Sequence, residues 1–158
     1  MECLSRSRRL EIMKILIATD GSEYSAEAVR KACSFWGPIA DTVFKVVSVY
    51  EDTRMLAAEP FAVSAEYYQD MAEAARNQAN HFAETAAGEI TKICPGASVT
   101  TEVLSGPPGK RIIDLAGEWG ADVLVVGSHG RGFWGRLLGS VSDAATHHSP
   151  CSVLVVRK

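Results

Sequence analysis

Glycines, serines and arginines crowd the segment "VVGSHGRGFWGRLLGSVS", which covers residues 125–142. A glycine lets backbone N–H groups come close to a phosphate because it has no Cβ. A helix that opens at such a loop adds a favourable partial charge worth about 0.3 to 1 kcal/mol. These residue types therefore indicate a phosphate-binding loop, and the spacing of the glycines decides which kind it is.

Two common phosphate-binding loops match this segment only in part. Residues 130–135 spell G-x-G-x-x-G, but a dinucleotide-binding fold carries that motif after its first strand, with an acid at the end of the next strand. Here the next strand is the last one, and it ends in Arg157 and Lys158. A P-loop requires Gly-Lys-Ser/Thr, whereas Gly135 is followed by Arg136. Both interpretations are disfavoured.

A third interpretation takes Gly127, Gly130 and the later pair Gly139 and Ser140 as the meaningful set. A second polar turn, "ATDGSEYS", follows the first predicted strand and carries Asp20. This carboxylate could accept hydrogen bonds from ribose hydroxyls or hold a magnesium ion. The local chemistry equally fits an Asx turn, and both roles stay open for it.

Stretches rich in β-branched residues alternate with stretches of helical periodicity. Five strands are predicted, at Lys14–Thr19, Thr42–Tyr50, Ser98–Leu104, Ala121–Val126 and Ser152–Val156. Four helices are predicted between them: one capped by Ser22, one through Met71–Ile90 that stops before Pro95, one over Lys110–Trp119 and one over Ser140–His148. Such alternation indicates an α/β fold: a single doubly wound, Rossmann-like domain with a five-stranded parallel sheet and about four helices on its two faces.

The helical periodicity also predicts which side chains are buried. Met71 and Phe82 are expected in the core, as is Trp119 on the third helix. The segment Glu51–Tyr67 is predicted to be one long irregular connection, and a connection of that length is typically a functional lid or a mobile loop.

Length and composition narrow the function classes. The 158 residues suit one domain, predicted to span residues 13–158, while residues 1–12 are interpreted as a disordered extension. A net charge of -3 with interspersed signs argues against nucleic acid as a partner, and the apolar runs are too short to span a membrane. The four cysteines form no C-x-x-C pair, which favours reduced thiols in the cytoplasm.

Several motifs together resemble the universal stress protein family, whose nucleotide-binding members carry G-x2-G-x9-G-[ST] after the fourth strand. Gly127, Gly130, Gly139 and Ser140 follow that pattern with a spacer of eight residues in place of nine. The segments "KILIATDGSEYSAEA", "VVGSHGRG", "LLGSVS" and "SPCSVLVV" all stand where the family has their counterparts. The similarity extends from Met13 to the C-terminus.

The resemblance implies an ATP-binding stress-response module that uses magnesium. The nucleotide would be held by Ala18, Asp20, Val49, Gly127, Gly130, Arg131, Gly139, Ser140, Val141 and Ser142. In this correspondence Asp20 contacts the ribose, Val49 contacts adenine through its backbone, and Ala18 lines the pocket. Arg131 would add positive charge near the phosphates.

Three functional interpretations stay open. The first is a regulatory ATP-binding module, because the chain has no P-loop lysine and no obvious residue to orient an attacking water, although slow hydrolysis is compatible with it. The second is an adenylyl-transferring enzyme, which typically has a glycine-rich "SGGxDS" loop where this chain has "ATDGSEYS". The third is a nucleotide-free interaction module. His129 in the glycine loop is interpreted as a hydrogen-bonding loop residue and not as a catalytic one.

The last predicted strand, "SVLVV", is apolar yet stands at the end of the chain. In the family this strand lies at the edge of the sheet, where unpaired backbone groups invite association. The resemblance therefore implies a homodimer that pairs through this strand, with Arg157 and Lys158 as charged residues that limit further association.

Deleting residues 1–11 should change neither the melting temperature nor nucleotide affinity, because this segment shows no periodicity and precedes the first predicted strand. Calorimetry and nucleotide titration of the truncated chain test this. A clear loss of melting temperature would show that the segment packs on the domain.

Overall fold

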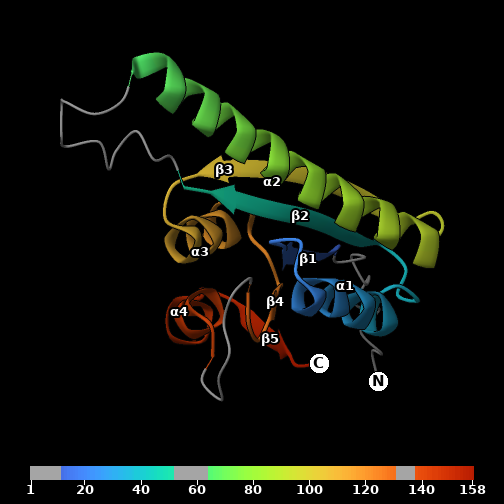
Figure 1. Cartoon of the computed structure of the whole chain (residues 1–158). Helices are drawn as coiled ribbons and strands as arrows, with labels where there is room; N and C mark the ends of the chain where they lie inside the picture. Colours follow the sequence, from blue (N-terminus) through green and yellow to red (C-terminus); the bar gives the residue numbers. More distant parts are fainter. Residues whose placement is uncertain (1–11, 52–63, 131–137) are drawn as a thin grey trace, which may run out of the picture.

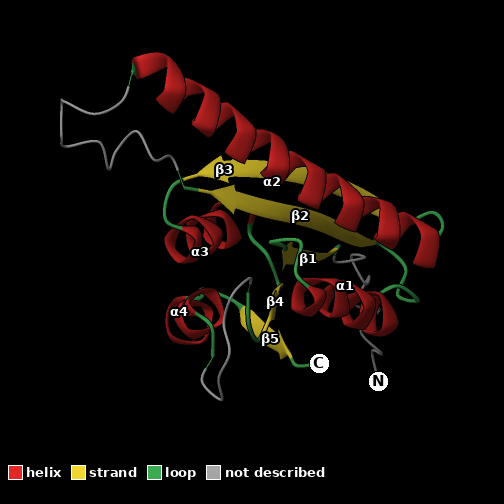
Figure 2. Cartoon of the chain, viewed as in Figure 1, coloured by secondary structure: helices red, strands yellow, loops and turns green. Residues whose placement is uncertain are grey.

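The computed structural model describes residues 12–51, 64–130 and 138–158, and within them strands and helices alternate (Figures 1 and 2). The strands are β1 (Met13–Ala18), β2 (Thr42–Tyr50), β3 (Ser98–Ser105), β4 (Val123–Gly127) and β5 (Ser152–Val156). The helices are α1 (Glu23–Trp36), α2 (Ala65–Ile93), α3 (Pro108–Trp119) and α4 (Ser140–His148). The predicted α/β architecture is confirmed.

All five strands are parallel and lie in the order β3-β2-β1-β4-β5. β1 is central, with Ile15 opposite Phe44 of β2 on one side and opposite Val123 of β4 on the other. β5 lies at one edge of the sheet, as the family resemblance implies, and β3 lies at the other.

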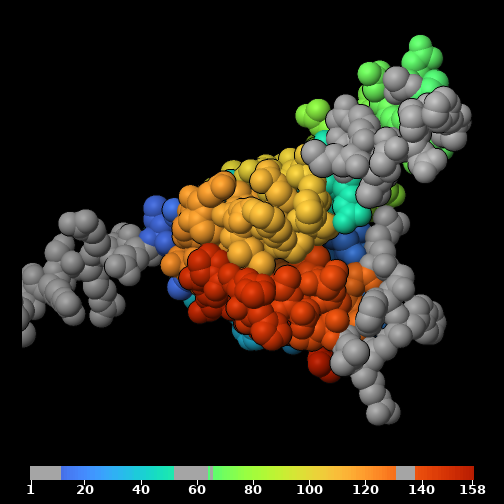
Figure 3. All heavy atoms as spheres, turned by 90° about the vertical axis from the view of Figure 1, so that its left-hand side faces the viewer, coloured from blue at the N-terminus to red at the C-terminus, as the bar shows by residue number. Residues whose placement is uncertain are grey.

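Two helices cover each face of the sheet. Successive side chains of a strand point to opposite faces, and because the strands are apolar on both faces, both need to be covered. In β1, Ile15 and Ile17 pack under α1 and α2, whereas Leu16 and Ala18 pack under α3 and α4. Figure 3 shows α3 and α4 lying next to each other on their face. The core is thus two apolar layers separated by the sheet.

The strand order places a topological switch point between β1 and β4. From β1 the chain moves outward through β2 to β3, and it then returns across the sheet to β4, on the other side of β1. The connections that leave β1 and β4 therefore diverge to opposite faces. A crevice forms at their carboxyl ends, which is where ligands bind in open α/β sheets.

Helix α2 differs from the sequence prediction in its start and in its buried face. It begins at Ala65, so the end of the predicted 51–67 connection is helical, and residues 52–63 lie outside the described residues. The prediction that Met71 is core is wrong, since this side chain is 45% exposed. A helix of 29 residues spans about 43 Å, whereas the nine residues of β2 span about 30 Å. The first turns of α2 consequently extend past the end of the sheet, as Figure 1 shows.

Although α2 is long, it is not apolar. Across the described ranges, no helix combines the length and the hydropathy needed to cross a membrane.

Trp119, at the end of α3, is half-buried and packs against the apolar cluster under α3 and α4, so the prediction that it is a core side chain is confirmed only in part. Its carbonyl accepts a hydrogen bond of 3.0 Å from the Lys14 ammonium. The ammonium groups of Lys14 and Lys45 lie 5.6 Å and 5.3 Å from the centroid of its ring. The ring thus combines packing against the core with a cation–π contact to each of these lysines.

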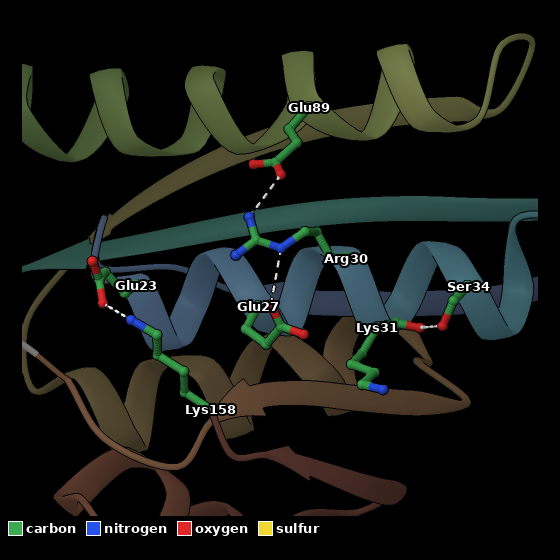
Figure 4. A network of polar contacts seen from close by, with 7 residues as sticks. All are labelled: Glu23, Glu27, Arg30, Lys31, Ser34, Glu89 and Lys158. Atoms are coloured by element: carbon green, nitrogen blue, oxygen red, sulfur yellow. Dashed lines mark hydrogen bonds and ion pairs between the residues drawn. The ribbon is translucent and has the colours of Figure 1, made fainter.

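Polar contacts connect the outer face of α1 to its neighbours (Figure 4). Arg30 donates to Glu27 on its own helix at 2.9 Å and to Glu89 on α2 at 3.4 Å. Lys158, which follows β5, pairs with Glu23 and lowers the pKa of that carboxyl group. These side chains are largely exposed, so the ion pairs orient the elements more than they stabilise the fold.

Candidate functional site

The carboxyl ends of β1 and β4 border a cavity of about 300 Å³. Nine predicted site residues line it together: Ala18, Asp20, Val49, Gly127, Gly130, Gly139, Ser140, Val141 and Ser142. The tenth, Arg131, lies outside the described residues. Residues up to 124 positions apart in the chain, from Ala18 to Ser142, thus meet at the switch point.

Asp20 forms the Asx turn that its sequence context predicts and also faces the cavity. Its Oδ1 accepts a 3.0 Å hydrogen bond from the Ser22 backbone N–H. Its Oδ2 points toward the glycine loop after β4, since a Cβ built on Gly130 would lie 2.8 Å from this oxygen. The two interpretations of Asp20 are therefore compatible, because they use different oxygens of one carboxylate.

Gly127 has a packing role that the sequence does not reveal. A Cβ at this position would lie 2.8 Å from the carbonyl carbon of Tyr24 and 3.0 Å from the backbone nitrogen of Ser25. Both atoms belong to the first turn of α1, so even an alanine would force that helix away from β4. Gly127 lines the cavity, and its lack of a side chain also lets α1 pack closely on the strand.

The two ends of the loop after β4 lie close together, although the spacer between Gly130 and Gly139 has eight residues. The Gly139 N–H donates a 2.8 Å hydrogen bond to the Ser128 carbonyl. The Ser142 hydroxyl lies 3.0 Å from the same carbonyl and 2.9 Å from that of Gly139. These contacts hold Gly139 beside Gly130, whose backbone nitrogen would be 3.5 Å from a Cβ on Gly139.

Helix α4 begins at this junction and directs its amino end into the cavity. Gly139 is its N-cap residue, and no side chain caps the helix. The next residues, Ser140 and Val141, line the cavity. The first N–H groups of a helix carry the positive end of its dipole, so this wall favours a negatively charged ligand.

Another part of the cavity lining is apolar. Ala18 and Val49 extend from the sheet, and the neighbouring helix α3 contributes Pro108 and Ile112. The cavity therefore combines an apolar surface suited to a flat ring with a wall of backbone N–H groups suited to phosphates.

Six cavity residues were missed by the sequence prediction: Thr19, Ser25, Pro108, Ile112, Val126 and His129. Pro108 could have been found, because it follows β3 as Asp20 follows β1, and the loops after parallel strands share one edge. Ile112 could not, since its place depends on where α3 crosses the sheet.

His129 makes the loop contacts that its sequence context predicts. Its Nδ1 lies 2.9 Å from the Ser128 hydroxyl, and its ring centroid lies 5.1 Å from that of Tyr24. Outside the cavity, burial raises the pKa of the Cys33 thiol to about 12, and the neighbouring Cys94 acts in the same direction. Cys33 is therefore a neutral thiol at physiological pH and a poor nucleophile.

Known proteins share this fold and these motifs. A model of the universal stress protein family matches residues 11–157. The chain belongs to this family. Universal stress protein Sll1388 of Synechocystis is 27% identical in an alignment of 151 positions that covers 91% of this chain and 97% of that protein. Universal stress protein MJ0531 of Methanocaldococcus jannaschii is 31% identical over 146 residues, 92% of this chain and 82% of that protein.

Solved structures agree with this assignment. The structure of the hypothetical protein MJ0577 superposes with a TM-score of 0.77 at 25% identity and covers 93% of this chain and 96% of its own. A universal stress protein solved in complex with cAMP superposes with a TM-score of 0.61 at 26% identity, over 91% of this chain and 96% of its own.

Replacing Gly130 with valine should weaken nucleotide binding about tenfold or more, because the new Cβ would lie 2.8 Å from Asp20 Oδ2 and would fill the space between the two loops. The fold should be little affected, since this loop is at the surface and not in the core. Isothermal titration with ATP measures the first effect, and urea unfolding measures the second.

Gly88→Ala is the matched control, because a Cβ at position 88 meets nothing within 4 Å and the residue lies on α2, away from the cavity. If Gly130→Val bound ATP as tightly as this control, the glycine would serve only to form the turn.

Proposed function

We propose that this universal stress protein is a regulatory ATP-binding module that holds the nucleotide between the loops after β1 and β4. The observation that carries the proposal is the convergence of the predicted residues on one cavity, with an apolar part and an uncapped helix N-terminus. The family member solved with cAMP supports an adenine nucleotide as the ligand class.

The backbone of Val49 is the proposed contact to adenine. The β1–β2 pairing ends where Ala18 meets Val47, and the Val47 carbonyl accepts a 2.9 Å hydrogen bond from the Thr19 N–H. Residues two apart in a strand direct their N–H and C=O groups to the same side. Val49 therefore directs one donor and one acceptor past the end of β1 toward the cavity, the pair that the edge of adenine requires.

The remaining walls of the cavity would bind the ribose and the phosphates of the nucleotide. Asp20 would accept hydrogen bonds from the ribose hydroxyls, and the backbone N–H groups at Gly130 and Ser140 would hold the phosphates. The space that a Cβ at Gly130 would fill is the cradle for this chain of phosphates. Magnesium, when bound with ATP, would neutralise phosphate charge, and such an ion needs only one or two protein carboxylates.

A regulatory role fits the cavity better than rapid turnover. None of the described residues that line it is a lysine or an arginine, so within that set no cationic side chain faces a transferring phosphate. The proposed module therefore reports nucleotide binding through its shape and its partners, and slow hydrolysis is compatible with this role.

ATP with magnesium should stabilise the fold. A ligand at one hundred times its dissociation constant contributes about 2.7 kcal/mol, which raises the melting temperature of a domain of this size by about 5 to 11 °C. Thermal-shift measurements on protein freed of nucleotide test this, with Gly130→Val as the control. An unchanged melting temperature at millimolar ATP would contradict ATP binding and favour a nucleotide-free interaction module.

We further propose that the protein forms a homodimer in the cytoplasm. The described cysteines, Cys33, Cys94 and Cys151, are all unbridged, which suits a reducing compartment. Strand β5 is an open edge, and its central residues 153–155 are only half-buried. A second copy could pair antiparallel with this edge through a two-fold axis. The β5 edge of each copy would then be covered by the other, and the assembly would close at two subunits.

Val155→Pro tests the dimer without breaking the sheet inside the protomer. The Val156 carbonyl accepts a hydrogen bond from Ser128, on the β4 side, so the backbone groups of Val155 point to the open edge. The proline removes a donor from that edge and should yield a monomer or an aggregate.

Light scattering coupled to size exclusion measures the mass of each variant. Leu154→Pro is the contrasting variant, because its lost N–H faces β4 and should lower the stability of the protomer itself. A wild-type mass of one chain would contradict the dimer, and an intact dimer in Val155→Pro would place the interface elsewhere.

A further inference from the structure

Phe82 of α2 packs directly on the turn that carries Asp20. Between Asp20 and α1, Gly21 adopts a φ of 74°. A Cβ built on Gly21 would lie 2.4 Å from Cδ1 and 2.5 Å from Cε1 of the Phe82 ring. The ring therefore occupies the space next to the Gly21 backbone, and no other residue type fits there without moving one of the two groups.

The turn separates two cavities, so a contact on one side of it can affect the position of Asp20 on the other. Thr19 and Ser25 line both the proposed nucleotide cavity and a second cavity of about 190 Å³ between α1 and α2, of which Phe82 is a wall. Short-range hydrogen bonds hold the turn from within, namely Ser22 N–H to Asp20 at 3.0 Å and Gly21 N–H to Thr19 Oγ1 at 3.3 Å. Phe82 supports the turn from the side away from the nucleotide.

No residue of α2 is among the described residues that line the nucleotide cavity. The helix nevertheless reaches the turn through the Phe82 ring. Further along, α2 packs on α1 through buried side chains such as Ala83 and Ala86. The ion pair between Arg30 and Glu89 is exposed and lies about two turns from Phe82 (Figure 4), so it can be broken without changing the ring.

We propose that Phe82 is a positioning residue, whose ring holds the turn at Gly21 so that the Asp20 carboxylate faces the nucleotide. This inference rests on the proposed function of the cavity. It makes α2 the element that sets the strength of the ribose contact, although α2 does not touch the ligand. A change in the packing of α2 would then alter nucleotide affinity through Asp20.

The first experiment needs no nucleotide. Hydrogen exchange of the Ser22 amide reports on its hydrogen bond to Asp20, and Phe82→Ala should raise that exchange rate about tenfold or more relative to the wild type. Arg30→Gln, which breaks the exposed ion pairs to Glu27 and Glu89 but keeps the Phe82 ring, should leave the rate unchanged. Equal rates in Phe82→Ala and the wild type would overturn the proposal. Phe82→Leu keeps the apolar volume without the flat ring and serves if the alanine variant does not fold.

The second experiment asks whether Phe82 acts through Asp20. ATP affinity is measured for the wild type, for Phe82→Ala, for Asp20→Ala and for the double variant. Phe82→Ala should weaken binding about fivefold or more in the wild type but less than about twofold when Asp20 is already absent. Independent effects of the two substitutions would overturn the proposal, because a general loss of structure acts in both backgrounds.

The two experiments separate failure of this inference from failure of the proposed function. A wild-type protein that binds no ATP refutes the function of the cavity, and the Ser22 exchange rates still decide whether Phe82 holds the turn. A wild type that binds ATP, with unchanged exchange in Phe82→Ala, refutes the role of Phe82 alone.

Discussion

The carbonyl oxygen of Ser128 accepts a hydrogen bond from the Gly139 N–H at 2.8 Å and lies 3.0 Å from the Ser142 hydroxyl. The N–H of the same residue donates to the Val156 carbonyl at 2.7 Å. Ser128 is buried, so leaving its carbonyl unpaired would cost about 1 to 3 kcal/mol. One residue thus joins the end of β4, the start of α4 and the end of β5. This junction places Gly139 and the amino end of α4 beside Gly130, where both line the cavity.

The other half of the site depends on close packing at the amino end of α1. Gly127 lets the first turn of that helix approach β4, and Phe82 contacts the preceding turn at Gly21 from α2. Three of the residues that line the cavity are glycines, so the site constrains the size of the side chain at each of these positions. Packing and the shape of the cavity are therefore coupled at the glycines, where a side chain would disturb both.

Secondary structure was predictable because the signals for it are local. β-Branched runs and capping residues placed β2, β5 and α4 at the bounds that the structure shows, and the other strands within two residues. The prediction for Met71 was wrong, and Trp119 and Phe82, also predicted as core, are only half-buried. Periodicity identifies the apolar face of a helix, but it does not show where the sheet beneath that face ends or which cations lie beside it.

The sequence by itself determined the alternation of strands and helices, the glycine pattern after β4 and the carboxylate after β1, because each depends on residues close together in the chain. Only the tertiary structure decided that Phe82 meets Gly21, that Gly127 packs on α1, and that Ile112 lines the cavity. These contacts join residues tens of positions apart. They depend on strand order, on register and on where each helix crosses the sheet, which are properties of the whole chain and of no single segment.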